Sequence, residues 1–127
     1  MESRERLGLL LTDDMIFSSR ITGTAQALGL KVSVAKSVND VTAQAREHLP
    51  ICIIIDLSHP GLQVPELIRE LRDTCSSMPR LVAYGSHVDA ATLRAAREAG
   101  CDVVLPRSQF AEKLPQELAR WMVAPAT

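Results

Sequence analysis

The sequence predicts an α/β protein built on an open, doubly wound parallel sheet of five strands. Short apolar runs alternate five times with longer amphipathic segments along the 127 residues. Strands that alternate with helices favour parallel pairing, because each return connection crosses over one face of the sheet. Five such units are fewer than the eight that close a barrel. We therefore expect one domain over residues 1–127, with a core over about residues 6–123.

The first segments of the chain predict two strands and the helix that joins them. Residues 7–11 are almost all leucine, which is typical of a strand buried on both faces. Apolar residues recur at helical spacing over residues 16–28, and Gly29 follows as a C-terminal stop. Residues 31–35 alternate valine with polar neighbours, which predicts a short second strand.

The next segments predict a second helix and the central strand. Ser37 is a suitable N-cap, and Pro50 ends the helix that follows it. The apolar face of this helix is expected to carry Val38, Val41, Ala45 and Leu49. Residues 51–55 form the most β-branched run of the chain, so we expect them to be a buried central strand.

The second half of the chain completes the alternation. Pro65 suits the first turn of a helix, and Gly100 suits the end of one. Pro115 predicts that the last regular helix begins near that residue, with Trp121 anchoring it to the sheet. The last four residues, 124–127, are expected to fray. The predicted elements are helices over 65–72 and 90–99, strands over 81–84 and 103–105, and an amphipathic segment over 110–123.

Composition excludes several classes of function. Hydrophobic residues make up 46% of the chain and charged residues 23%, with a formal net charge of −1. This balance lacks the basic footprint of a nucleic-acid-binding protein and gives no electrostatic attraction to an anionic membrane. No apolar stretch reaches the roughly 18–20 residues of a spanning helix, and we see no signal peptide. We therefore expect a cytoplasmic protein.

The cysteine pattern points to neither a disulfide framework nor a zinc site. The chain has three cysteines, Cys52, Cys75 and Cys101, with no CxxC spacing. Cys52 stands in an apolar run and is expected to be a small buried hydrophobic residue.

Polar residues follow four of the predicted strands, where open parallel sheets place their ligand sites. The first strand is followed by Asp13 and Asp14, and the third by Asp56. Three carboxylates that converge on one edge repel each other unless a cation lies among them, and oxygen ligands of this kind suit Mg²⁺. A carboxylate beside Mg²⁺ can attack phosphorus and form an aspartyl phosphate.

Three segments together resemble the receiver domain of two-component response regulators. Residues 10–14, Leu-Leu-Thr-Asp-Asp, are similar to the family's first strand and acidic pair. Residues 53–61 are similar to its third strand, phospho-acceptor aspartate and Pro-Gly turn, and residues 95–102 to its Ala-Gly-Ala-Asp turn. The resemblance covers nearly the whole chain and implies a flavodoxin-like sheet of order 2-1-3-4-5 flanked by five helices.

The resemblance also implies roles for particular residues. Asp56 matches the phospho-acceptor, and Asp13 and Asp14 match the metal-binding pair, with Asp14 the direct ligand. Ser58 matches the position whose backbone carbonyl completes the Mg²⁺ shell. Arg107 stands at the place of the family's lysine after the fifth strand.

Three positions depart from the family's pattern. The slot of its threonine or serine after the fourth strand holds Gly85, with Ser86 adjacent as a substitute. Arg107 follows Pro106 where the family has lysine followed by proline, and arginine prefers bidentate contacts. Val104 replaces the aromatic switch residue of the fifth strand.

Two functional hypotheses follow, neither of them a metabolic enzyme. In the first, a stand-alone receiver takes a phosphoryl group from a sensor histidine kinase or phosphotransfer protein onto Asp56 with Mg²⁺. It then signals by binding another protein, and it can dimerise through the face of the fourth helix, fifth strand and fifth helix. In the second, a pseudo-receiver uses the same face as an interaction module without phosphorylation.

Local alternatives stand beside these roles. Asp13 and Asp14 also suit an N-cap of the first helix. Arg107 suits a neutralising ion pair with the acidic cluster as well as a phosphoryl contact. His59 and His87 are expected to be solvated loop residues rather than ligands.

Overall fold

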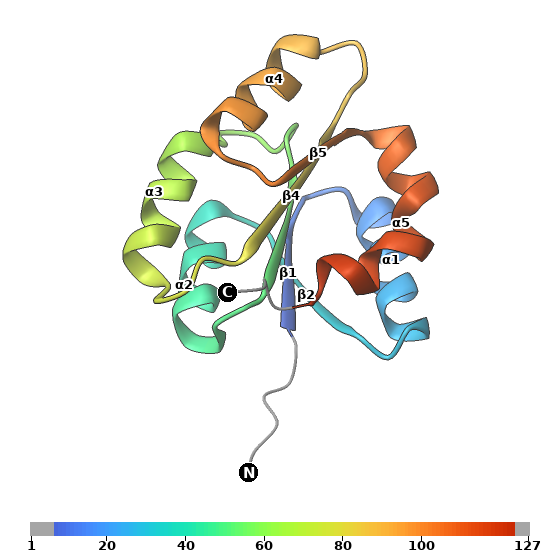
Figure 1. The fold of residues 1–127 in the computed structure, drawn as a ribbon, viewed down its shortest axis with the longest axis horizontal. Helices are drawn as coiled ribbons and strands as arrows, with labels where there is room; N and C mark the ends of the chain where they lie inside the picture. The colour runs from blue at the N-terminus through green and yellow to red at the C-terminus, as the bar shows by residue number, and fades with distance from the viewer. Residues whose placement is uncertain (1–6, 124–127) are drawn as a thin grey trace.

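The computed structural model describes residues 7–123, so the predictions for residues 1–6 and 124–127 lie outside the described residues. Five strands alternate with five helices along this range (Figure 1). The strands are β1 (Leu7–Leu11), β2 (Lys31–Ala35), β3 (Cys52–Asp56), β4 (Arg80–Gly85) and β5 (Val103–Pro106). The helices are α1 (Met15–Ala27), α2 (Val38–His48), α3 (Val64–Thr74), α4 (Ala90–Ala99) and α5 (Arg107–Trp121).

The strands form one parallel sheet in the order β2-β1-β3-β4-β5. This order confirms the predicted doubly wound α/β fold and the central position of β3. The register pairs Leu11 with Ile55 and Asp56 with Tyr84, so the carboxyl ends of these three strands meet at one edge. Polar residues that follow them are thereby brought together.

The helices cover both faces of the sheet, with α2, α3 and α4 on one side and α1 and α5 on the other (Figure 1). Successive strand residues point to opposite faces. In β3, Ile53 and Ile55 accordingly pack with α2, α3 and α4, while Cys52 and Ile54 pack with α1 and α5. The fully apolar sequence of β3 follows from this burial on both faces.

The last helix differs from its prediction. We expected a regular helix from about Pro115, but α5 begins at Arg107 and contains Pro115. Its buried residues Phe110, Leu114, Leu118 and Trp121 form one stripe that runs past the proline. Packing of this stripe on the sheet compensates for the backbone hydrogen bond that Pro115 cannot donate, a loss of about 3 kcal/mol. Trp121 is buried and stacks on Phe110 at 5.5 Å between ring centroids, which confirms its anchoring role.

The end of the second helix also differs. Leu49 was expected on the buried face of α2, but it follows the helix in a left-handed conformation, with φ of 51° and 36% of its surface exposed. Pro50 disfavours the right-handed helical conformation in the residue before it, so the helix ends at His48. The Ser37 hydroxyl caps the other end by accepting a hydrogen bond from Asp40 N at 3.0 Å, as predicted.

No helix within residues 7–123 combines the length and the apolar character needed to cross a membrane.

Candidate functional site

The candidate site is centred on Asp56, the last residue of β3. Its position at the carboxyl end of the central strand places it between residues that follow β1, β4 and β5. The side chain is only 1% exposed. A carboxylate that is buried so completely needs hydrogen-bond donors to replace the water it has lost.

Three donors supply both oxygens of this carboxylate. The Thr12 hydroxyl donates to Oδ2 at 2.7 Å, from the residue directly after β1. The backbone N–H of Ser58 and its hydroxyl both donate to Oδ1, at 3.0 and 2.6 Å. Thr12 Oγ1 in turn accepts a hydrogen bond from Asp14 N at 3.0 Å, which fixes the orientation of the hydroxyl. The carboxylate is therefore held by groups of its own chain.

A cation lies beside this network. Arg107, the first residue of α5, places Nη2 at 4.0 Å from Asp56 Oδ1. The Arg107 guanidinium carbon lies 5.7 Å from the ring centroid of Phe17 and 5.9 Å from that of Tyr84, within the range of cation–π attraction. Its Nε is buried and has no hydrogen-bond partner within residues 7–123. Two aromatic rings and one long ion pair therefore surround this guanidinium.

Tyr84 forms the aromatic wall of the site. It is opposite Asp56 in the β3–β4 register and is fully buried, and its hydroxyl lacks a partner among the described residues. Burial, and secondarily the negative charge of Asp56, raise the pKa of the Tyr84 phenol well above its ordinary value. The ring lies 4.9 Å from Phe17 and 4.7 Å from Phe110, measured between centroids. Tyr84 is therefore a neutral, packed residue rather than an acid–base group.

Comparison with solved structures identifies this arrangement of strands and helices. A signal receiver domain from Bermanella marisrubri matches with a TM-score of 0.79 at 22% identity, covering 94% of this chain and 99% of that chain. A putative response regulator from Chloroflexus aurantiacus J-10-fl matches with a TM-score of 0.78 at 19% identity, covering 93% and 98%. The signal receiver domain of the putative response regulator NarL from Mycobacterium tuberculosis matches with a TM-score of 0.77 at 15% identity. This match covers 94% of this chain and 98% of that chain. No protein-family model and no curated protein matches the sequence.

This chain has the receiver-domain fold. The predicted flavodoxin-like architecture and the likeness to response-regulator receiver domains are thus confirmed at the level of structure. At these identities the matches establish the fold, and the roles of individual residues depend on the geometry of the site itself.

The receiver fold brings Asp56, Ser58 and Arg107 together as predicted, but it uses the acidic pair differently. Asp14 Oδ1 accepts a hydrogen bond from Phe17 N at 3.0 Å, so its carboxylate caps α1. Asp13 is exposed to solvent. The sequence allowed the acidic pair to be either metal ligands or an N-cap of α1. The structure shows Asp14 as the N-cap.

The three carboxylates that the sequence predicted around a magnesium ion do not gather at one point. No group of three or more His, Cys, Asp or Glu side chains within residues 7–123 is placed to hold a metal. Asp14 is engaged with the α1 backbone, and both Asp56 oxygens already accept hydrogen bonds. Ser58 donates its N–H and hydroxyl to Asp56, and these two bonds leave its carbonyl, the predicted ligand, unaffected. The expectation of a gathered three-carboxylate site at Asp13, Asp14 and Asp56 is therefore not met.

Ser86 follows β4 directly and lines the same cavity as Arg107, and its role as a phosphoryl-binding hydroxyl stays a prediction. Ser86 is exposed in the β4–α4 loop, and its hydroxyl accepts a hydrogen bond from Val88 N at 3.3 Å. The neighbouring Gly85 has little room for a side chain, because an added Cβ would lie 3.3 Å from Leu57 Cβ and 3.4 Å from Leu93 Cδ2. The hydroxyl that contacts Asp56 comes from Thr12 instead.

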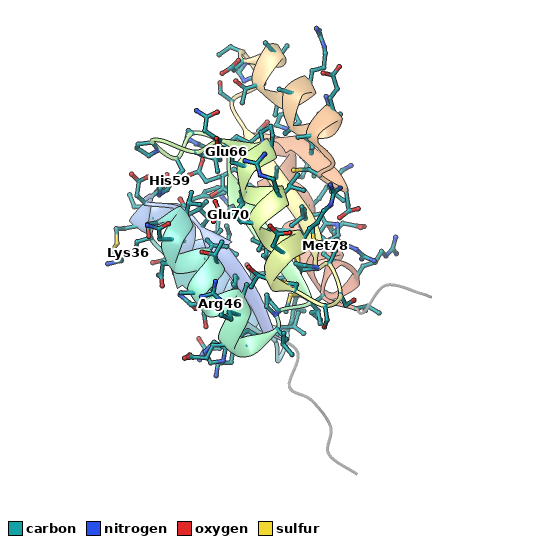
Figure 2. All side chains as sticks on the ribbon, turned by 90° about the vertical axis from the view of Figure 1, so that its left-hand side faces the viewer. Lys36, Arg46, His59, Glu66, Glu70 and Met78 are labelled. Atoms are coloured by element: carbon teal, nitrogen blue, oxygen red, sulfur yellow. The ribbon has the colours of Figure 1, made fainter. Side chains whose placement is uncertain are left out.

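His59 is more structured than a solvated loop residue. It is half-buried, and its Nε2 lies 2.8 Å from the carbonyl oxygen of Lys36 at the start of the β2–α2 turn. Figure 2 shows His59 and Lys36 at the same end of α2. The histidine therefore ties the β3–α3 loop to the β2–α2 turn. His87 is exposed, as expected.

Sequence reasoning missed three residues of the site: Thr12, Phe17 and Tyr84. Thr12 could have been noticed as a polar residue between a buried strand and the acidic pair. Phe17 and Tyr84 are two of only four aromatic residues, counting one tryptophan, one tyrosine and two phenylalanines. The two rings contact Arg107 only through tertiary packing, which no local sequence pattern predicts.

Proposed function

We propose that this chain works as a receiver-like signalling module that binds a partner protein without phosphorylation of Asp56. The observation that carries this proposal is the burial of the Asp56 carboxylate, which is 1% exposed and accepts hydrogen bonds from Thr12 and Ser58. A nucleophile must reach its electrophile at about 3–3.5 Å in an aligned approach. A carboxylate enclosed by its own hydrogen bonds does not offer that approach.

The surroundings of Asp56 support the same function. Gly85 lacks a hydroxyl, and a Cβ added there would contact Leu57 and Leu93 at 3.3–3.4 Å, so a larger side chain would have to displace these leucines slightly. Arg107 lies over Phe17 and Tyr84 beside the carboxylate. The arrangement favours a neutralised, structural aspartate that fixes the ends of β1, β3 and α5 relative to one another.

A second candidate function is the phosphoryl acceptor with Mg²⁺, supplied by a sensor histidine kinase or phosphotransfer protein. The position of Asp56 at the end of β3, with Arg107 4.0 Å away, favours it. Phosphorylation would require the carboxylate to break its bonds to Thr12 or Ser58. Conformational opening of the β3–α3 loop would have to precede the reaction.

Incubation with acetyl phosphate and MgCl₂, followed by intact-protein mass spectrometry, separates the two candidates. We expect no Asp56-dependent mass increase, with a phosphorylatable receiver domain treated in parallel as the positive control. The matched variant is Asp56→Asn, which keeps the shape of the side chain and removes the nucleophile. A mass increase of one phosphoryl group that disappears in Asp56→Asn would overturn the interaction-module proposal and support the second candidate.

We also propose where the partner binds. The face of α4, β5 and α5 is the surface expected from the receiver resemblance, for a partner or for a second copy of the chain. Exposed apolar residues lie at a different place, with Ile16 and Met15 at the start of α1 exposed by 86% and 72%. Val88, in the β4–α4 loop, is 79% exposed. The start of α1 is therefore the stronger candidate surface, and a cytoplasmic location stays part of the proposal.

A further inference from the structure

Beside the Asp56 network lies an open pocket of about 410 Å³ that the proposed function does not use. Three segments line it: α1 through Phe17 and Arg20, the β4–α4 loop through Ser86 and His87, and the start of α5 through Arg107 and Ser108. Its volume lies within the roughly 300–1,000 Å³ that small-molecule sites occupy in proteins. The carboxylate of Asp56 is not part of its lining, but Arg107 borders both the pocket and the Asp56 network.

The lining is cationic and carries no acidic side chain. Arg20 lies one helical turn after Phe17, is exposed, and makes no ion pair within residues 7–123. Arg107 has only the 4.0 Å contact with Asp56, and its buried Nε is unpartnered among the described residues. Two guanidinium groups with unused donors therefore border one cavity. Guanidinium groups match the oxygens of phosphate in fork geometry.

The backbone at the start of α5 adds donors on the same side. Pro106 precedes the helix and provides no side-chain cap, and the first turn contains no acidic residue. The side chains of Asp14, Ser37 and Asp89 cap α1, α2 and α4, whereas α3, like α5, has no side-chain cap. Free N–H groups and the positive end of the helix dipole favour an anion at such a terminus. The Ser86 and Ser108 hydroxyls provide further donors around the cavity.

The apolar part of the pocket indicates that the ligand is larger than a free anion. Phe17 and Ala111 contribute apolar surface to the cavity, and the Arg107 guanidinium carbon lies over the Phe17 ring, 5.7 Å from its centroid. A guanidinium that already lies over one ring can stack against a further planar organic group on its other face. From the cavity, the two arginines and this stacking surface, we propose that the pocket binds a phosphate ester of a planar organic molecule, such as a nucleoside monophosphate. Binding is reversible and forms no covalent bond.

Titration of the purified chain with three probes tests the assignment by ¹⁵N chemical-shift changes at low ionic strength. The probes are AMP, which has both the phosphate and the ring, inorganic phosphate, and adenosine. We expect saturable shifts in residues of the pocket with AMP, and weaker binding of the other two probes. If AMP binds no more tightly than inorganic phosphate, the ester assignment is overturned. If adenosine binds as tightly as AMP, the anion site is overturned.

Variants locate the binding. Arg20→Gln removes one exposed guanidinium that supports no packing, and we expect it to weaken AMP binding at least about tenfold, as for the loss of a charge-assisted hydrogen bond. Arg46→Gln is the matched control and should leave the affinity unchanged. Figure 2 shows Arg46 on α2, and α2 covers the face of the sheet opposite to α1 and α5. Equal affinities of the two variants would overturn the proposal. The titration contains neither MgCl₂ nor a phosphoryl donor, so its outcome is independent of the test of Asp56 phosphorylation.

Discussion

Substitution of Thr12 by valine tests whether the buried network around Asp56 has the structural role that its geometry indicates. The valine side chain fills nearly the same volume but cannot donate to Asp56 Oδ2, which the hydroxyl contacts at 2.7 Å. It also removes the acceptor for Asp14 N, at 3.0 Å. Because Asp56 is 1% exposed, water cannot readily replace the lost donor.

The expected cost follows from these two bonds. A hydrogen bond to a charged group contributes about 1.5–3 kcal/mol, and Asp14 is only half-buried, so its N–H can recover part of its loss from water. We therefore expect Thr12→Val to lower the free energy of unfolding by about 2–3 kcal/mol. Thr12→Ser keeps the hydroxyl and loses one methyl group, so it should cost less than about 1.5 kcal/mol.

Urea denaturation followed by the fluorescence of the single tryptophan, Trp121, measures both values. With a urea dependence of about 1–3 kcal/mol per molar, the Thr12→Val midpoint should fall by about 0.7–3 M. A double-mutant cycle with Asp56→Asn isolates the pair. In that background the lost bond is between neutral groups, so Thr12→Val should cost about 1 kcal/mol less than in the original chain.

The reasoning is refuted if Thr12→Val changes the free energy of unfolding by less than about 0.5 kcal/mol. It is equally refuted if the loss is the same with aspartate and with asparagine at position 56. Either result would mean that solvent or a rearranged Ser58 satisfies Asp56 as well as Thr12 does.

Two further predictions concern the core. Phe110 is fully buried between Tyr84 and Trp121. Phe110→Ala should therefore lower the free energy of unfolding by about 3–5 kcal/mol, and Phe110→Leu should lower it by less. Equal losses for the two variants, measured by chemical denaturation, would contradict this. Burial raises the pKa of the Cys52 thiol from 9.0 to about 12. As the pH rises, the thiol therefore loses its proton in the unfolded chain before it does so in the folded chain. The free energy of unfolding should be fully retained below pH 9 and should decline between pH 9 and pH 12. The decline should be smaller in Cys52→Ala, and parallel pH profiles of unfolding free energy for the two proteins would disprove the role of this thiol.

The fold was largely predictable because burial is encoded in periodicity. The apolar run of β3 requires a strand covered on both faces, and the alternation of strands and helices requires parallel pairing. The start of α5 was not predictable from local rules, because Pro115 argues against a continuous helix. Only the packing of Phe110 and Leu114 on the sheet, before the proline, compensates for the missing bond.

The site was predictable in position but not in detail. Asp56 could be placed at the sheet edge because the strand before it is unmistakable. Its partner Thr12 lies 44 residues away and reaches it through the β1–β3 register, which the sequence does not specify. An aspartate at position 14 suits both a metal ligand and an N-cap of α1. Only the direction of its side chain, toward Phe17 N, shows the N-cap.

The junction between β5 and α5 limits how the site can move. Pro106 ends the strand and Arg107 begins the helix, so no loop separates them, and the proline ring fixes φ at −57°. A displacement of the Arg107 backbone would therefore move the first turn of α5. Phe110 lies in that turn and stacks on Trp121. The fluorescence of the single tryptophan should thus report movements at the start of α5, beside Asp56, without an added label.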